Sequence, residues 1–181
     1  MNTESLTDTR LGRWFVRIMA SIMESPLRYR FFGAARILQG ADVHPGQTVL
    51  EVGCGTGFFT LPAARLLGEH GSLVALDVLS ESVEAVTRRV QAANLGNVRV
   101  MQGDVLDTHL PSEGFDAVLI FGVIPAPMLP MHRLVSEMHR VLKPGGIMAV
   151  WPPSWVHRMI VKSGQFVFSS RQNGVLNYRR V

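Results

Sequence analysis

The segment whose residue types and spacing are best suited to bind a ligand is VLEVGCGTG, residues 49–57. Its three alternate glycines follow an apolar run and precede a helical pattern. Glycine lets the backbone approach a ligand closely, and N–H groups at a helix start attract an anion. A dinucleotide-binding fingerprint from Gly53 would need glycine or alanine in place of Phe58, and no Gly-Lys-Ser/Thr follows as in phosphate-binding loops. The residues predict a ligand-binding loop of another kind, with a tight structural turn as the alternative.

Two aspartates follow the next two apolar runs of the chain. Asp77 comes 20 residues after Gly57, and Asp104 stands in the segment Gly103-Asp104-Val105. Parallel strands bring such positions to one sheet edge, where open α/β sheets bind ligands. There, Asp77 can accept both hydroxyls of a ribose, Asp104 can meet an adenine amino group and Val105 can pack on the ring. Each aspartate taken alone is more typical of a helix cap or a loop.

The elements that must position these residues alternate between apolar runs and helical patterns from Thr48 onward. This alternation predicts an α/β fold with a largely parallel sheet covered by helices on both faces. The expected strands cover residues 48–52, 73–77, 98–102, 117–121 and 147–151. The expected helices cover residues 60–67, residues 81–94 with Ser80 as cap, and residues 131–142 with Met131, Leu134, Val135, Met138 and Val141 on one stripe.

Both ends of the chain depart from this alternation. Beyond residue 151, a helix over 155–163 and strands over 165–170 and 175–179 predict an antiparallel hairpin, because Asn173-Gly174 is a strong turn signal. Near the start, a basic amphipathic helix is indicated by the apolar Leu11, Trp14, Phe15, Ile18, Met19, Ile22 and Met23 opposite Arg10, Arg13 and Arg17. Ser25-Pro26 starts a second helix through Leu38. We expect residues 1–40 to form a helical lid or packing appendage on a domain over residues 41–181.

Taken in order, the segments VLEVGCGTG, ALD, GDV, FDAVLIFG and LKPGG resemble the hallmark segments of class I S-adenosylmethionine-dependent methyltransferases. The resemblance is strong over residues 47–151. It implies a Rossmann-like doubly wound fold, S-adenosylmethionine as cofactor and S-adenosylhomocysteine as product. The cofactor-binding residues that it implies are Glu51, Gly53, Cys54, Gly55, Thr56, Gly57, Asp77, Val78, Gly103, Asp104, Val105, Phe121 and Gly122.

The resemblance also assigns these residues to parts of the cofactor. Glu51 and the three loop glycines surround the methionine part, Asp77 binds the ribose, and Asp104 with Val105 holds the adenine. Residues 121–122 close the site. The segment 143–146 is expected to be a proline-glycine turn that starts the fifth strand.

The sequence identifies no catalytic residue. Transfer of a methyl group from a sulfonium is an in-line displacement that depends mainly on positioning. A protonated amine or hydroxyl acceptor also needs a base, for which His132, His157, His109 and Asp107 are candidates, although a lone histidine is more typical of the surface. A single cysteine, Cys54, excludes a cysteine-based zinc cluster, and no metal is expected.

The absence of certain motifs limits the classes of molecule that can be the methyl acceptor. Residues 121–124 lack the Asn/Asp-Pro-Pro-aromatic motif that holds a flipped adenine, and the position of Cys54 disfavours cysteine-dependent methylation of cytosine C5. Residues 1–40 and 123–131 are rich in Trp, Phe, Met and Pro, which favours an apolar, small or lipid-like acceptor. An RNA or protein acceptor stays open because both ends of the chain are basic. A non-catalytic cofactor-binding module that acts through a partner is the alternative of another class.

The length and composition of the chain limit its domain organisation and its location. The chain has 181 residues, 47% of them hydrophobic, and its net charge of +4 is divided into +3 over residues 1–40, −4 over residues 41–150 and +5 over residues 151–181. Such a chain forms one domain with a sizeable core. No apolar run is long enough to span a bilayer, and the N-terminus lacks a secretory pattern. We expect a cytoplasmic protein, with peripheral membrane contact through residues 10–24, and the sequence does not indicate its oligomeric state.

Overall fold

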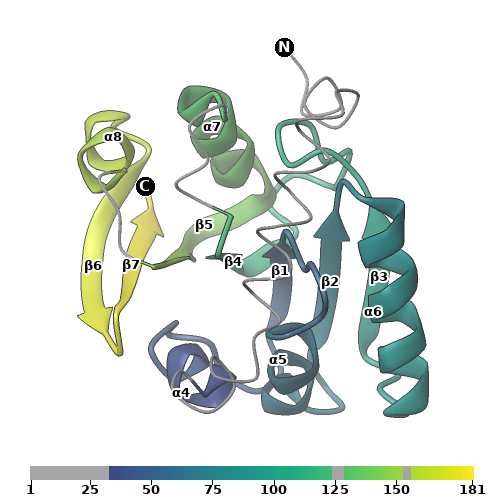
Figure 1. Cartoon of the computed structure of the whole chain (residues 1–181). Coiled ribbons are helices and arrows are strands. Elements are labelled where there is room, and N and C mark those ends of the chain that lie inside the picture. The colour runs from purple at the N-terminus through teal and green to yellow at the C-terminus, as the bar shows by residue number, and fades with distance from the viewer. Residues whose placement is uncertain (1–32, 124–128, 153–155) are drawn as a thin grey trace.

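A seven-stranded sheet forms the centre of the protein in the computed structural model, which describes residues 33–123, 129–152 and 156–181. The strand order is β3-β2-β1-β4-β5-β7-β6 (Figure 1). The strands are β1 (Thr48–Val52), β2 (Ser72–Asp77), β3 (Val98–Gln102), β4 (Phe115–Phe121), β5 (Leu142–Trp151), β6 (Phe166–Gln172) and β7 (Val175–Arg180). Strands β1 to β5 pair in parallel, whereas β7 is antiparallel to both β5 and β6. The predicted doubly wound sheet with a C-terminal antiparallel hairpin is confirmed.

Helices cover both faces of this sheet. They are α4 (Ala34–Leu38), α5 (Thr60–Leu67), α6 (Ser80–Ala92), α7 (Met131–Val141) and α8 (His157–Lys162). Figure 1 shows α7 and α8 on one side of the sheet and α4 and α5 on the other. α6 packs beside α5 against β2 and β3. Within the described ranges, no helix has the length and apolar character needed to cross a bilayer.

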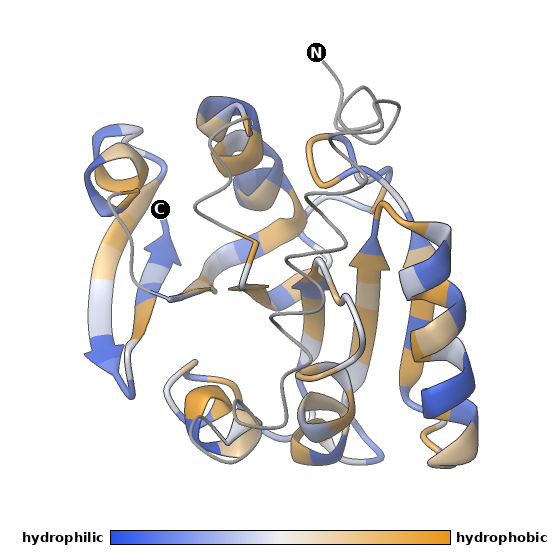
Figure 2. Ribbon diagram, in the orientation of Figure 1, coloured by the Kyte–Doolittle hydropathy of each residue, from blue (hydrophilic) through white to orange (hydrophobic). Residues whose placement is uncertain are grey.

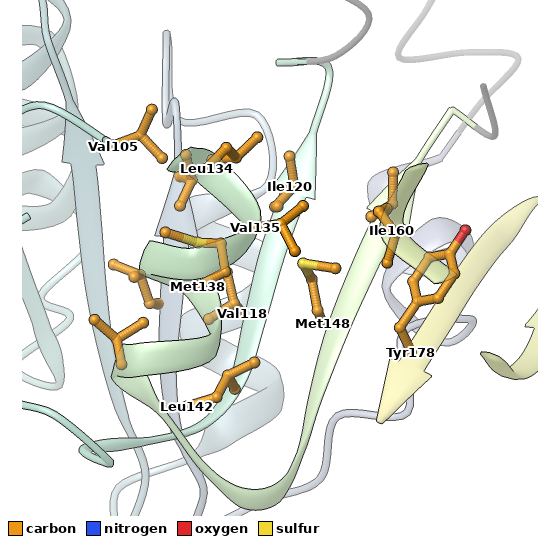
Figure 3. Packing of buried hydrophobic residues seen from close by; sticks show 14 of the residues in the cluster. Val105, Val118, Ile120, Leu134, Val135, Met138, Leu142, Met148, Ile160 and Tyr178 are labelled. Carbon is orange, nitrogen blue, oxygen red and sulfur yellow. The ribbon is translucent and has the colours of Figure 1, made fainter. Parts of the chain in front are cut away.

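The larger apolar cluster lies between the sheet and the α7–α8 layer. The predicted stripe of α7 is confirmed, because Met131, Leu134, Val135, Met138 and Val141 are all buried. Figure 3 shows three residues of this stripe facing β4 and β5. They are Leu134, Val135 and Met138, opposite Val118, Ile120 and Met148. Each such side chain contributes about 1.5 to 3 kcal/mol when it leaves water, so this layer fixes the positions of β4 and β5.

The opposite face is covered by α4 and α5, and here the two ends of the described chain meet. Ile37 and Leu38 are buried in the cluster that also holds α5 and the centre of the sheet. The hairpin turn at Asn173 and Gly174 has φ angles of 49° and 80°, as the Asn-Gly signal predicts. The Asn173 side chain donates from Nδ2 to the carbonyl of Arg36 at 2.8 Å. Residues 34–38 therefore pack as part of the sheet's own core.

Three local features differ from the sequence-based expectation. Ser80 is the first residue of α6 and its side chain makes no cap, because the N-cap position falls on Leu79, whose own N–H donates to the Asp77 carboxylate at 3.0 Å. Residues 143–146 fall within the bounds of β5, which begins at Leu142, but they have no partner on β4 or β7, and Gly145 has a φ of 74°. They form an irregular segment between Leu142 and the regularly paired part of the strand that begins at Ile147. Of the two expected N-terminal helices, only α4 falls within the described residues, and it ends at Leu38 as expected.

Candidate functional site

The loop between β1 and α5 is held in a conformation that glycine adopts without strain. Gly53, Gly55 and Gly57 have φ angles of 69°, 52° and 82°, in the left-handed region. The N–H groups of Gly53 and Cys54 donate to the carbonyl of Leu76 at 2.8 and 3.1 Å, which ties the loop to β2. The N–H of Gly57 donates to the carbonyl of Cys54 at 2.8 Å. Alternate glycines are thus required by the path of the backbone.

Asp77 binds this loop to the end of β2. Its Oδ2 accepts from the Gly55 N–H at 2.8 Å, and its Oδ1 accepts from the Leu79 N–H at 3.0 Å. The side chain is 8% exposed, and this burial raises the pKa of the carboxyl above its usual value, although both backbone bonds oppose the rise. A carboxylate has about four acceptor positions, so each oxygen keeps one for a ligand hydroxyl. Asp77 can therefore shape the loop and bind a ligand at once.

Glu51 points into the protein beneath the loop. It is 2% exposed, and its Oε2 accepts from the Thr60 hydroxyl at 2.6 Å. Burial raises the pKa of Glu51 from 4.5 to about 8, against the opposing effect of the Thr60 bond. Glu51 thus joins the end of strand β1 to the first residue of α5, which supports the loop between them.

The segment after β4 lies directly over the glycine loop. A Cβ built on Gly53 would lie 2.5 Å from Cγ2 of Val123, so only glycine allows this approach. The N–H of Gly122 donates to the carbonyl of Trp151 at 2.7 Å, which joins the ends of β4 and β5. Phe121 is buried and packs edge-to-face on Phe59, with ring centroids 4.9 Å apart. The structure thus brings Phe121 and Gly122 to the same edge as the loop.

Gly103, Asp104 and Val105 extend the site along the same edge. The N–H of Gly103 donates to the carbonyl of Asp77 at 3.0 Å, so the ends of β2 and β3 lie side by side. Asp104 is partly exposed, and its Oδ1 accepts from the Leu106 N–H at 2.8 Å. Val105 is buried in the α7-side cluster. Asp104 therefore has the turn role that was its alternative, and it keeps acceptor capacity for a ligand.

The remaining predicted residues of the loop region have backbone roles or are buried. The carbonyl of Thr56 accepts from the Arg89 side chain on α6, and the carbonyl of Val78 accepts from the Gln102 side chain at 3.0 Å. Cys54 is buried, and this burial raises the pKa of its thiol. Its protonated thiol acts as a small apolar group in the wall beneath the loop.

The four candidate bases do not gather at this edge as buried, oriented groups. His132 is exposed on α7. His109 and Asp107 are exposed and lie 3.3 Å apart, between Nδ1 and Oδ1. His157 on α8 has its Nδ1 2.9 Å from the hydroxyl of Tyr178. No group of three or more His, Cys, Asp or Glu side chains in the described part of the chain could hold a metal ion.

Sequence reasoning missed several residues that build the site. Thr60, Leu79 and Arg89 each bond a predicted site residue, and Val123 covers Gly53. One signal was available for Thr60, because an acid within the apolar run of β1 requires a buried partner. The other contacts join elements that are distant in sequence or use backbone groups, which residue type does not reveal.

This arrangement places hydrogen-bond acceptors and an accessible backbone along one edge of the sheet. The carboxylates of Asp77 and Asp104 offer acceptors for hydroxyl and amino groups at neighbouring strand ends. The glycine loop offers close backbone approach one strand further along. A protein family described as a methyltransferase domain matches residues 49–146, the part of the chain that contains all of these groups.

Comparison with known proteins identifies relatives and a shared fold. The chain is 31% identical over 145 residues to a demethylmenaquinone methyltransferase of Geobacillus kaustophilus, a match that covers 77% of this chain and 61% of the relative. It is 38% identical over 106 residues to one of Bacillus cereus, covering 58% and 44%. A SAM-dependent methyltransferase from Aquifex aeolicus superposes with a TM-score of 0.77 at 22% identity, covering 90% of this chain and 97% of that one. The chain thus spans 44 to 61% of the length of these two curated relatives.

Proposed function

The chain belongs to the methyltransferase domain family, and we propose that it transfers the methyl group of S-adenosylmethionine to a small, lipid-like quinone. The observation that carries the proposal is the bond between the Asp77 carboxylate and the Gly55 N–H, because it joins the ribose acceptor to the glycine loop. The relatives named as demethylmenaquinone methyltransferases support the quinone class of acceptor.

The residues present fit S-adenosylmethionine part by part. Asp77 would accept hydrogen bonds from the ribose hydroxyls, and Asp104 would accept one from the adenine amino group beside Val105. The glycine loop would receive the methionine part, since its backbone is exposed at Gly53 and the space beside Gly55 is open. When bound, S-adenosylmethionine supplies a methyl group that its sulfonium already activates.

The chain's own contribution is to hold these groups in fixed positions. The Gly55 and Leu79 N–H groups orient the Asp77 carboxylate, and Thr60 orients Glu51 beneath the loop. Well-oriented reactants can gain about 7 to 11 kcal/mol over free encounter in solution. An activated methyl group and a nucleophilic acceptor need little more than this, which agrees with exposed positions for the four candidate bases.

An aromatic edge supports an apolar, ring-shaped acceptor. Phe121 and Trp151 end neighbouring strands, and both lie against Phe59, with ring centroids 4.9 and 5.9 Å from it. Trp151 is half-buried, whereas the other two rings are buried. Aromatic side chains bind flat rings by stacking and edge-to-face contact. We assign the half-buried ring of Trp151, supported by the two buried rings, to the acceptor side of the site.

Calorimetry with S-adenosylhomocysteine and an analogue that lacks both ribose hydroxyls tests the cofactor assignment. In the wild type, the analogue is expected to bind at least about 10-fold more weakly, because charged hydrogen bonds contribute about 1.5 to 3 kcal/mol each. In Asp77→Ala, the two ligands are expected to bind alike. Asp42→Asn removes an exposed carboxylate at the other end of the sheet and serves as the charge control. Equal loss of affinity for the analogue in the wild type and in Asp77→Ala would refute the ribose assignment.

Transfer from labelled S-adenosylmethionine to separated lipid, RNA and protein fractions tests the acceptor class. The expected result is label in the lipid fraction, recovered on a quinone. Label in RNA or protein would establish the corresponding alternative. Cofactor binding without transfer to any fraction would indicate a non-catalytic module that acts through a partner.

Two further assignments rest on the sequence alone and are part of this proposal. Residues 1–40 would act as a lid or packing appendage on the transferase domain of residues 41–181. The basic amphipathic segment at residues 10–24 would contact a membrane peripherally, which suits a lipid-like acceptor. Both concern segments that lie mostly outside the described residues.

A further inference from the structure

The exposed apolar side chains of the protein gather in one part of the chain. Among the described residues, five large hydrophobic side chains are 40 to 61% exposed, and all of them lie beyond residue 158. They are Met159, Val161, Val167, Phe168 and Val181. Single exposed apolar residues are ordinary, but four of these five lie on one helix and the adjoining strand, α8 and β6, and this collection requires an explanation.

The same part of the chain carries only positive charge. Residues 151–181 contain five bases and no acid. Arg180 is directed inward and pairs with Glu113, whereas Arg158, Lys162 and Arg171 are exposed. Exposed apolar side chains therefore alternate with basic ones on this surface.

The two sets adjoin where α8 packs against β6. Val156 and Ile160 anchor α8 in the core, which leaves Arg158, Met159, Val161 and Lys162 exposed. The rings of His157 and Phe168 lie 5.4 Å apart, so the helix and the strand are in contact. We call the exposed side chains of α8 and β6 the α8–β6 surface.

The α8–β6 surface lies at the edge of the sheet. β6 is the terminal strand of the sheet order, and Figure 1 shows it with α8 at the outer side of the molecule. Figure 2 shows that β6 is apolar in its first half and hydrophilic toward the hairpin turn. Successive strand residues point to opposite faces, so Val167 and Phe168 make both flanks of this edge apolar.

We propose that the α8–β6 surface docks the protein on an anionic phospholipid membrane. Exposed apolar side chains enter the headgroup region while neighbouring bases meet lipid phosphates, the combination by which peripheral proteins bind anionic membranes. A second copy of the chain would instead set like charges against each other across the edge. Docking by this surface is separate from methyl transfer and from the N-terminal segment.

Co-sedimentation of the full chain with vesicles tests the proposal, using phosphatidylglycerol mixed with phosphatidylcholine against phosphatidylcholine alone. Neither cofactor nor acceptor is present, so the result does not depend on the proposed function. The wild type is expected to bind the anionic vesicles and to lose binding as salt is raised. The double variant Arg158→Gln/Lys162→Gln is expected to bind about 30-fold more weakly, which corresponds to about 1 kcal/mol for each basic side chain.

A matched control removes the same charge elsewhere. Arg65→Gln/Arg99→Gln takes two exposed bases from α5 and from β3 at the other edge of the sheet, and is expected to bind as the wild type does. Met159→Ser/Val161→Ser keeps the charge and is expected to bind about 10-fold or more weakly, because it removes buried apolar area. Circular dichroism and thermal unfolding establish that each variant is folded.

Several results would overturn the proposal. Equal losses in Arg158→Gln/Lys162→Gln and in the matched control would show attraction by net charge alone. A loss confined to Arg13→Gln/Arg17→Gln would assign docking to the N-terminal segment. A salt-independent dimer that Val167→Ser/Phe168→Ser dissociates would show that a second copy covers the surface. No binding of the wild type to anionic vesicles would exclude membrane docking altogether.

Discussion

Glu51 gives the protein an unusual dependence of stability on pH, which the variant Glu51→Gln isolates. In the folded state, burial raises the pKa of this carboxyl from 4.5 to about 8. Between these two pH values, the folded protein therefore binds more protons than the unfolded chain. The free energy of unfolding must fall as pH rises through this range, and the decline must stop above about pH 8.

The size of this fall in the free energy of unfolding follows from the size of the pKa change. One pKa unit corresponds to about 1.4 kcal/mol, so the rise at Glu51 amounts to a loss of up to about 5 kcal/mol between pH 4.5 and pH 8. Asp77, whose pKa is also raised by burial, adds to the decline. The carboxyl of Glu137 acts in the opposite direction and at lower pH. Burial alone would raise its pKa, but hydrogen bonds from Arg140 and Thr108 lower it to about 2.

Glutamine at position 51 matches the protonated carboxyl in shape and cannot ionise. Its carbonyl can still accept from the Thr60 hydroxyl, so the buried hydrogen bond is retained. Equilibrium urea unfolding at unit steps from pH 5 to pH 9 measures the effect. We expect the stability of Glu51→Gln to be nearly flat over this range, apart from the smaller contribution of Asp77, while the wild type declines.

The exposed Glu69 provides the control, because Glu69→Gln removes the same charge without changing a buried group. This control is expected to decline with pH as the wild type does. Parallel curves for Glu51→Gln and the wild type would refute the reasoning. Such curves would mean that Glu51 is ionised in the folded protein at neutral pH and is stabilised by a group other than Thr60.

Three further predictions concern the site and its covering segment. Gly53→Ala is expected to lower the free energy of unfolding by at least about 1 kcal/mol and to weaken S-adenosylhomocysteine binding measured by calorimetry, because Gly53 has a left-handed φ and lies against Val123. Gly96 has open space around it, so Gly96→Ala is expected to change neither stability nor binding. Asp77→Ala is expected to weaken the same ligand more than Asp104→Ala, since it removes two ribose contacts, and a reversed order would contradict the assignment. Deletion of residues 1–24 is expected to leave ligand affinity nearly unchanged while lowering transfer to the acceptor, and loss of folding would show these residues to be part of the core.

Local sequence features were sufficient to predict most of the sheet. β1 and β3 begin and end where their apolar runs do, at Thr48–Val52 and Val98–Gln102. The Asn-Gly pair predicts its turn because few other residues adopt two left-handed conformations in succession. Asp77 and Asp104 are brought to one edge because parallel strands end there.

Contacts between distant segments account for what the sequence could not reveal. Ser80 has the residue type of a cap, but the helix begins one residue earlier than expected, so Leu79 takes the N-cap position and Asp77 binds its N–H. Lys143-Pro144-Gly145-Gly146 has the composition of a turn and pairs with neither β4 nor β7, but the pairing of Leu142 with Phe115 ahead of it brings it within the bounds of β5. The burial of Glu51 depends on the packing of α5, which residue type at position 51 does not specify.

The contact of α4 with the hairpin has a consequence for the order in which a growing chain folds. The partners of two of its hydrogen bonds, Asn173 with the carbonyl of Arg36 and Asn177 with that of Gly40, are 137 residues apart in sequence. The ribosome has therefore released α4 long before the β6–β7 hairpin that contacts it has been synthesised. Strands β1 to β4 can pair earlier. The contact between α4 and the hairpin forms last, because it has a large entropy of loop closure to overcome. Substitutions at Asn173 or Asn177 should then reduce the yield of folded protein during synthesis, while the molecules that do form this contact bind ligand normally.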